Sequence, residues 1–241
     1  MMPKLIDTHF HLDHYRNYLE IAKSITAMAH YTICVTNSPG VFLSCKNMIP
    51  ETKYLKFAIG FHPMESGLGN NDLRDFLFLL DKTNYIGEIG LDFSKSAHMP
   101  REEQLRFFET IIEKCSSENK LMTVHIRSAE QQAVEILRKY SPKKCIIHWF
   151  TGNEKQMDEF LELGCFLSIN TNMVVSRSRS KYLRIPMNRL LVESDGPYSK
   201  VSGKKYVPDL LQQSYDQISD FYGMPDLAAV VFSNFRAILE L

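Results

Sequence analysis

The sequence predicts an α/β fold, a (β/α)8 TIM barrel, from three observations. Eight short β-rich apolar runs recur along the chain, and their starts lie 20 to 36 residues apart, the length of one βα unit. Segments with helical spacing of apolar residues lie between several of these runs. The length of 241 residues suits a single barrel, which typically needs about 250. We therefore expect one domain over residues 1–241.

The expected strands cover residues 5–9, 32–36, 57–61, 85–90, 121–126, 145–150, 165–169 and 190–193. The expected helices cover residues 72–81, 102–115, 129–140 and 154–163, and Gly164 stands where a helix C-cap belongs. Eight parallel strands alternating with helices close a barrel. An open doubly wound sheet is the alternative, and the absence of GxGxxG after the first strand weakens it.

Composition narrows the class of protein. The chain has 28 basic and 28 acidic residues, 44% hydrophobic residues and 23% charged residues, which is typical of a globular protein. A formal net charge of zero disfavours binding to nucleic acid through the overall field, although a local basic patch remains compatible with it. The five cysteines form no CxxC pair, so we expect reduced thiols and a cytoplasmic protein. The N-terminus lacks a signal peptide and no run is long enough to span a membrane, so no membrane partner is expected.

The active site of a TIM barrel lies at the carboxyl ends of its strands. His9 and His11 end the first expected strand and, being two residues apart, point to the same face. Each candidate alone has a structural explanation, such as a buried histidine, a buried ion pair or a helix N-cap. Five strand ends that all supply imidazole or carboxylate groups instead indicate two divalent ions sharing a bridging carboxylate. The candidate metal ligands are His9, His11, Glu88, His125, His148 and Asp195.

Six segments in this order resemble the motifs of the TatD family of metal-dependent deoxyribonucleases, a family of TIM-barrel metal-dependent hydrolases. They are residues 7–13 (DTHFHLD), 60–63 (GFHP), 87–92 (GEIGLD), 125–127 (HIR), 148–152 (HWFTG) and 193–198 (ESDGPY). The last two are most similar to the branch found in the Qat anti-phage defence system (QatD). After Phe93 the family usually has a basic residue close by, whereas this chain continues with Ser94, Lys95 and Ser96.

The resemblance implies a role for each matching residue. His9, His11 and Asp195 would hold one ion, His125 and His148 would hold the other, and Glu88 would bridge the two. Asp195 would also orient or deprotonate the attacking water, so Asp195 and Glu88 are the catalytic candidates. His62 would contact the scissile phosphate. The ions would be Mg²⁺ or Mn²⁺, with Zn²⁺ as an alternative, because imidazole and carboxylate ligands do not choose among them.

The function implied is hydrolysis of phosphodiester bonds in DNA, from the 3′ end of a single strand, with RNA as an alternative substrate. Residues 174–206 hold eight basic and two acidic residues, a net charge of +6, and follow the last two expected strands, where barrels often bind phosphate. Arg127 shares the face of His125 and is a candidate for substrate binding. Trp149 and Tyr198 flank candidate ligands and suit either base stacking or packing.

Two other functions remain open on the sequence. A hydrolase of small amides or esters is one, although many such barrels bridge their ions with a carboxylated lysine and the fourth strand end offers Glu88 instead. A metal-stabilised, non-enzymatic partner of other Qat components is the second. Retention of every expected ligand speaks against it, because a binding protein needs none of them.

Overall fold

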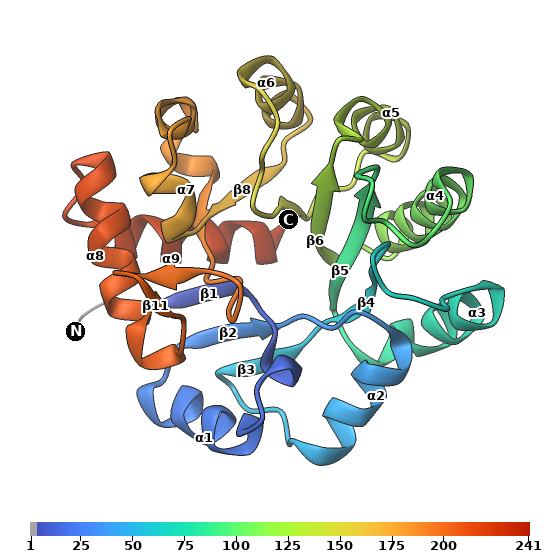
Figure 1. The fold of residues 1–241 in the computed structure, drawn as a ribbon, viewed down its shortest axis with the longest axis horizontal. Helices are drawn as coiled ribbons and strands as arrows, with labels where there is room; N and C mark the ends of the chain where they lie inside the picture. The colour runs from blue at the N-terminus through green and yellow to red at the C-terminus, as the bar shows by residue number, and fades with distance from the viewer. Residues whose placement is uncertain (1–3) are drawn as a thin grey trace.

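A computed structural model describes residues 4–241, so residues 1–3 of the expected domain lie outside the described part. Parallel strands occupy the centre and helices surround them (Figure 1). The central strands are β1 (Ile6–Phe10), β2 (Tyr31–Cys34), β3 (Leu55–Phe57), β4 (Ile59–Phe61), β5 (Tyr85–Asp92), β6 (Leu121–Arg127), β7 (Cys145–Ile147), β8 (Phe166–Ile169) and β9 (Leu190–Val192). Each of the eight expected strands is confirmed, and the run at 57–61 is split between β3 and β4.

The strands pair in chain order, as βα units predict. One parallel ladder runs from β1 to β3 and a second runs from β4 to β9. Only Ala58 separates β3 from β4, and its backbone N–H donates to the Cys34 carbonyl. No ladder joins β1 to β9 in residues 4–241, but the chain after β9 closes on β1: Asp195 N donates to His9 O (2.8 Å) and His11 N donates to Gly196 O (2.9 Å). The carboxyl ends of the first and last strands therefore lie together.

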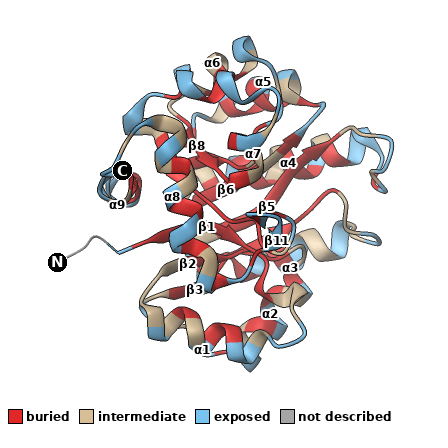
Figure 2. Ribbon diagram, turned by 60° about the vertical axis from the view of Figure 1, so that its left-hand side comes forward, coloured by how far each residue is buried: buried red, intermediate tan, exposed pale blue. Residues whose placement is uncertain are grey.

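Helices cover the outside of the sheet, and the faces that they turn toward it are buried (Figure 2). They are α1 (Tyr18–Met28), α2 (Pro39–Met48), α3 (Asn70–Leu79), α4 (Arg101–Ser117), α5 (Glu130–Tyr140), α6 (Glu154–Glu162), α7 (Thr171–Val175), α8 (Leu211–Tyr222) and α9 (Leu227–Glu240). The four expected helices are confirmed as α3 to α6. Gly164 follows α6 with φ of +83°, the left-handed conformation that ends helices and favours glycine.

An antiparallel hairpin of β10 (Lys200–Val201) and β11 (Lys204–Lys205) was not expected from the sequence. Its strands are two residues long and consist mainly of lysine, so neither periodicity nor composition marks them. The hairpin follows β9 and precedes α8.

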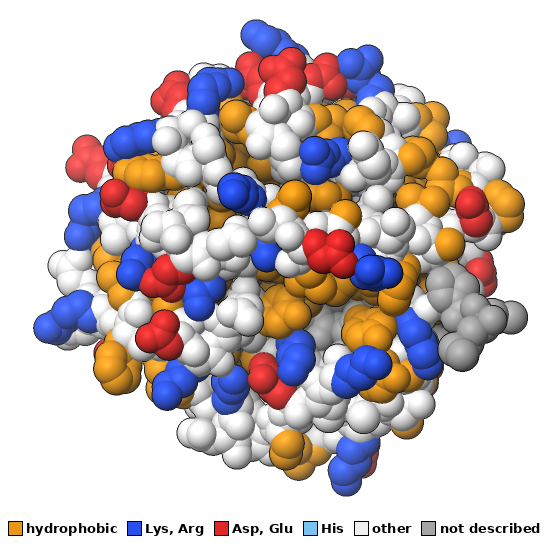
Figure 3. Space-filling model, turned by 180° about the vertical axis from the view of Figure 1, so that it is seen from behind, with side chains coloured by type: hydrophobic (Ala, Val, Ile, Leu, Met, Phe, Trp, Pro, Cys, Tyr) orange, Lys and Arg blue, Asp and Glu red, His pale blue; other side chains and the backbone are white. Residues whose placement is uncertain are grey.

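The five cysteines are buried and unpaired, as expected for reduced thiols. Lys and Arg side chains are interspersed with Asp and Glu on the face shown in Figure 3, in keeping with the net charge of zero. None of the helices in residues 4–241 combines the length and the apolar sequence that crossing a membrane requires.

Candidate metal centre

The six candidate ligands converge at the carboxyl ends of the strands. The first two lie in and directly after β1, one lies within β5, one within β6, one directly after β7 and the last after β9. Five of the six residues are buried; His125 is partly exposed. The residues brought together are His9, His11, Glu88, His125, His148 and Asp195, and His62 lies among them.

One group of donor atoms surrounds a single point. His9 Nε2 and His11 Nε2 are 3.4 Å apart. Glu88 Oε2 lies 3.3 Å from the first and 3.2 Å from the second, and Asp195 Oδ1 lies 3.6 and 3.4 Å from them. Ligands about 2.0–2.1 Å from a tetrahedral ion are separated by about 3.3–3.4 Å. The spacing of these four donors therefore fits one divalent ion.

The other oxygen of Glu88 faces a second group. Oε1 lies 3.0 Å from His62 Nε2, from His125 Nδ1 and from His148 Nε2. One carboxylate thus turns its two oxygens toward two separate sets of imidazoles. This is the arrangement that a bridging ligand between two ions requires.

The rings of His9 and His148 are stacked, with centroids 3.9 Å apart and an angle of 10° between the planes. The lone pair of an imidazole nitrogen lies in the plane of the ring, so two stacked rings cannot direct their lone pairs at one ion. The stacking therefore assigns these histidines to different positions.

His62 differs from the other histidines in its hydrogen bonding. Its Nδ1 accepts from the backbone N–H of Met64 at 3.1 Å. Burial lowers the pKa of His62, so the ring is neutral and its single proton resides on Nε2. A protonated Nε2 donates a hydrogen bond and does not bind a metal ion. The geometry therefore suits His62 to a contact with an anion.

Two carboxylates stand behind the histidines of the second group. His125 Nε2 lies 3.1 Å from Asp92 Oδ2, and His148 Nδ1 lies 3.5 Å from Glu193 Oε2. Such partners fix the tautomer and the orientation of metal-binding histidines. Burial alone would raise the pKa of Asp92, but hydrogen bonds from His125 and from Ser94 hold it below its ordinary value.

Glu193 is fully buried and held by three donors. Ser168 Oγ donates to Oε2, while Asn170 Nδ2 (3.0 Å) and Trp149 N (3.1 Å) donate to Oε1. Trp149 adopts φ of +35° and Asp195 adopts φ of +48°, values that are uncommon for residues other than glycine. The backbone beside two of the candidate ligands is thus held in unusual conformations.

Several supporting residues were not identified from the sequence. Thr123 Oγ1 lies 2.8 Å from His9 Nδ1, which leaves Nε2 of that ring free for an ion. Asp7 accepts from the backbone N–H of Ser194 at 2.8 Å and thereby ties β1 to the segment that carries Asp195; burial raises the pKa of Asp7 to about 7. Asp7 lies two residues before His9 on an alternating strand, and this spacing is the one sequence signal that points to it.

The charge balance of the site favours cations. Burial alone would raise the pKa of Glu88, but the imidazoles that surround both of its oxygens hold it well below its ordinary value. Burial opposes protonation of His11, yet hydrogen bonds to Asp195 and Glu88 raise its pKa to about 10. Protons on imidazoles therefore balance the buried carboxylates in the positions where metal ions would do so.

The donors open into a cavity of about 810 Å³. Arg127, at the end of β6, and the aromatic residues Trp149 and Tyr198 line it. His14 also lines the cavity, and its Nδ1 lies 2.7 Å from the hydroxyl of Tyr198. None of the eight basic residues of segment 174–206 lines this cavity within the described chain, although Asp195 and Tyr198 of the same segment do.

Comparison with known proteins places the chain among metal-dependent hydrolases. It is 26% identical to the uncharacterized metal-dependent hydrolase YcfH of Escherichia coli K12, over 98% of this chain and 96% of that protein. It is 29% identical to the 3′-5′ ssDNA/RNA exonuclease TatD of Pectobacterium carotovorum, over 68% of this chain and 69% of that protein.

Solved structures agree on the fold. The TatD homologue YjjV of Escherichia coli K12 covers 100% of both chains with a TM-score of 0.87 at 20% identity. A TatD family hydrolase of Entamoeba histolytica covers 99% of this chain and 98% of that chain, with a TM-score of 0.80 at 18% identity. The TIM-barrel hydrolase fold expected from the sequence is thus confirmed. The family model for TatD related DNases matches residues 6–240, and the chain therefore belongs to the TatD-related DNase family.

Proposed function

We propose that the chain is a divalent-metal-dependent nuclease that removes nucleotides from the 3′ end of single-stranded DNA, with RNA as an alternative substrate. The observation that carries this proposal is the division of Glu88 between two donor groups, with Oε2 near His9 and Oε1 near His148. The Pectobacterium relative named for 3′-5′ activity on single-stranded DNA and RNA supports the polarity and the substrate.

The residues at hand suit Mg²⁺ or Mn²⁺, with Zn²⁺ as an alternative, because they combine imidazole and carboxylate donors. His9, His11 and Asp195 would hold one ion, His125 and His148 the other, and Glu88 would bridge them. When bound, two divalent ions supply the positive charge that neutralises a phosphodiester and favours deprotonation of water.

The protein side chains would perform the remaining steps. Asp195 takes a proton from the attacking water; burial raises its pKa, which makes the carboxylate a better proton acceptor. His62 donates a hydrogen bond from Nε2–H to a phosphate oxygen, a contact that strengthens as charge develops there. Arg127, which lines the cavity, pairs with a neighbouring phosphate.

A hydrolase of small amides or esters is the alternative function. The cavity offers no lysine that could be carboxylated among the described residues that line it. The cavity does offer His62, whose Nε2–H is available as a hydrogen-bond donor, and Arg127, and both side chains suit a phosphate. These features favour the nuclease.

We also propose a place in a Qat-type defence system, with other components of that system as partners, on the resemblance of residues 148–152 and 193–198. Plaque assays on cells that express the system with wild-type chain or with Glu88→Gln test this. Equal protection by both would leave a non-enzymatic partner as the better description.

The activity is tested with 3′-labelled and 5′-labelled single-stranded DNA in Mg²⁺ or Mn²⁺, using wild type, Glu88→Ala and Asp195→Ala. We expect the wild type to shorten the strand from the 3′ end and both variants to be inactive. If folded, metal-loaded wild type leaves DNA and RNA intact but hydrolyses cyclic amides or lactones, the amidohydrolase alternative replaces the nuclease.

A further inference from the structure

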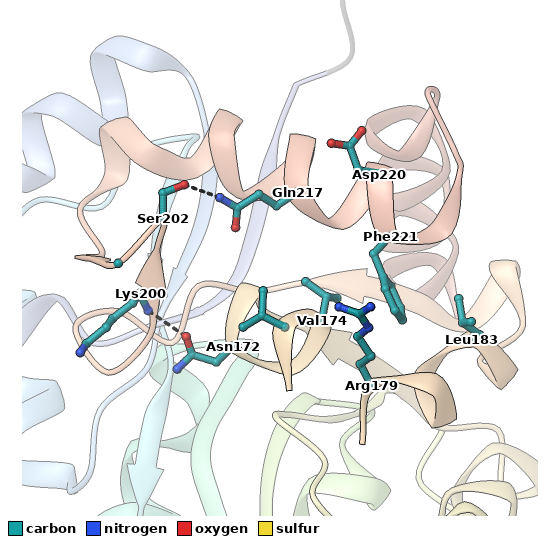
Figure 4. Close-up of a pocket in the computed structure, with 11 residues that line it drawn as sticks. Asn172, Val174, Arg179, Leu183, Lys200, Ser202, Gln217, Asp220 and Phe221 are labelled. Atoms are coloured by element: carbon teal, nitrogen blue, oxygen red, sulfur yellow. Dashed lines mark hydrogen bonds between the residues drawn. The ribbon is translucent and has the colours of Figure 1, made fainter. Parts of the chain in front are cut away.

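A second cavity, of about 860 Å³, lies beside α7 and is separate from the metal centre (Figure 4). In Figure 4 it extends as a groove from Lys200 at one end to Leu183 at the other, with α8 along its upper side. We call it the α7–α8 groove. It is lined by Asn172 of α7, Arg179 of the 3-10 helix that follows α7 (Arg179–Arg184), Lys200 and Ser202 of the hairpin, and Gln217 and Phe221 of α8.

The walls of this groove are fixed by hydrogen bonds. Lys200 N donates to Asn172 Oδ1 at 3.1 Å, and Thr171 Oγ1 donates to Lys200 O at 2.7 Å. On the other side, Gln217 Nε2 donates to Ser202 Oγ at 2.6 Å. The hairpin is thereby attached to both α7 and α8, so the groove exists before any ligand binds.

The groove contains two basic residues of segment 174–206 whose charges have no structural role. Lys181 is buried and donates to the carbonyls of Thr151 and Gly152, and Arg184 pairs with Asp158. Arg179 and Lys200, in contrast, are exposed and have no ion pair or side-chain hydrogen bond with any residue in 4–241. Asp220 is the single acidic side chain among the described residues that line the groove, so its net charge is positive.

Residues that line the groove lie close in the sequence to residues that line the metal cavity. Tyr198 lines the metal cavity and Lys200 lines the groove, and two residues span at most about 7 Å. A second link lies at the start of α7: Asn170, which caps this helix, donates to Glu193 behind His148, and Asn172 in its first turn lines the groove. One end of the groove therefore lies within two residues of the rim of the metal cavity, near enough for a strand of several nucleotides to reach both.

We propose that the α7–α8 groove holds the 5′ continuation of the single strand whose 3′ end is cleaved at the metal centre; this rests on the proposed nuclease function. Lys200 and Arg179 neutralise two phosphates of the strand, at different points along the groove. Phe221 offers a ring on which a base stacks, and stacking does not depend on base identity. The apolar side chains that the groove exposes, Val175 and Leu183, extend this surface and would otherwise suit a protein segment.

The test measures how activity depends on strand length. Steady-state rates are compared on oligothymidylates of two and twelve nucleotides and on bis(p-nitrophenyl) phosphate, a small diester without bases. The variants are Arg179→Gln with Lys200→Gln, and separately Gln217→Glu, which adds a negative charge to the groove. The matched control is Lys23→Gln with Lys155→Gln, which removes two exposed helix charges outside both cavities.

We expect the Arg179/Lys200 variant to raise KM on the twelve-nucleotide strand at least tenfold at 0.15 M salt, with KM for the dinucleotide and turnover of the small diester within twofold of wild type. The slope of log(1/KM) for the long strand against log[salt] should become shallower by about 1.4, or about 0.7 for each phosphate that the protein no longer neutralises. Gln217→Glu should also raise KM for the long strand alone, and the control should change neither substrate.

Other outcomes would overturn one proposal or the other. Equal KM values for both lengths in wild type and in the Arg179/Lys200 variant would refute the groove and leave the nuclease intact, with a protein segment as the better occupant. Hydrolysis of the small diester without cleavage of either oligonucleotide would refute the nuclease itself. Melting temperatures measured by circular dichroism verify that each variant is folded.

Discussion

Glu193 Oε2 lies 3.5 Å from His148 Nδ1 at the back of the metal centre, and the same oxygen accepts from the Ser168 hydroxyl. His148 Nδ1 makes no hydrogen bond to any described residue, so Glu193 acts on it through its charge, which favours a proton on Nδ1 and leaves Nε2 free to bind an ion. Glu193 is fully buried and is not one of the six candidate ligands, and this contact indicates that it orients His148.

Glu193→Gln should weaken metal binding without unfolding the protein. The glutamine oxygen can still accept from Trp149 N and Asn170 Nδ2, but its amide then donates toward His148 Nδ1. That favours the wrong tautomer of His148 and should lower the affinity for one of two ions by about 10–100-fold. Calorimetric titration with Mn²⁺ checks this, and an unchanged affinity would show that Glu193 only supports the fold.

His62→Ala should reduce activity and preserve metal binding. Because Nδ1 of His62 accepts from Met64 N, its Nε2 carries the proton and serves as a donor to phosphate. Loss of one such donor typically lowers kcat by about 10²–10³-fold. Metal content by mass spectrometry should remain at the wild-type value in His62→Ala and fall in His125→Ala; a joint fall would make His62 a ligand.

Metal affinity should rise with pH. Without an ion, hydrogen bonds to Asp195 and Glu88 raise the pKa of His11 to about 10, and Glu88 and Glu193 raise that of His148 despite its burial. An ion binds only the neutral rings, so it displaces protons throughout the range below about pH 10. Titrations at pH 6.5 and 8.5 in buffers of different ionisation enthalpy should show tighter binding at the higher pH and net proton release. Binding that is independent of pH would mean that the rings are already neutral.

The metal-free protein should become less stable as the pH rises, because the imidazole protons that compete with metal ions also stabilise the fold. The pKa of His11 is higher in the folded state, at about 10, than the ordinary value of 6.5, so its contribution to stability is complete below about pH 6.5 and is lost as the pH rises toward 10. The melting temperature in EDTA should therefore fall between pH 7 and 9. With saturating Mn²⁺ it should not fall.

The sequence was sufficient to predict the barrel and the convergence of the candidate ligands, because local patterns mark the strands and parallel strands bring their carboxyl ends together. Apolar runs mark the strands, and a carboxylate such as Glu88 inside an apolar strand, or an imidazole at its end, is conspicuous. The partners of Glu193 could not be predicted, since Ser168 and Asn170 are 25 and 23 residues away and carry no signal of their own. The two-residue strands of the hairpin and the groove beside them likewise depend on tertiary contacts, as in the bond from Gln217 to Ser202.

Gly90→Ala should displace β6 at a candidate ligand. Gly90 pairs with His125 in the ladder between β5 and β6, and its φ is +152°. A Cβ on Gly90 would lie 1.9 Å from the carbonyl oxygen of His125 and 2.7 Å from its carbonyl carbon, so backbone would have to move. We expect a loss of at least about 2 kcal/mol in the free energy of unfolding, together with loss of metal at the group that contains His125. The matched control is Gly40→Ala in α2, where the added Cβ meets nothing closer than 4.0 Å and should stabilise the helix by about 0.5–1 kcal/mol. Urea unfolding of both variants measures the difference, and equal stability in the two would show that the approach of β5 to β6 is not what requires glycine at this position.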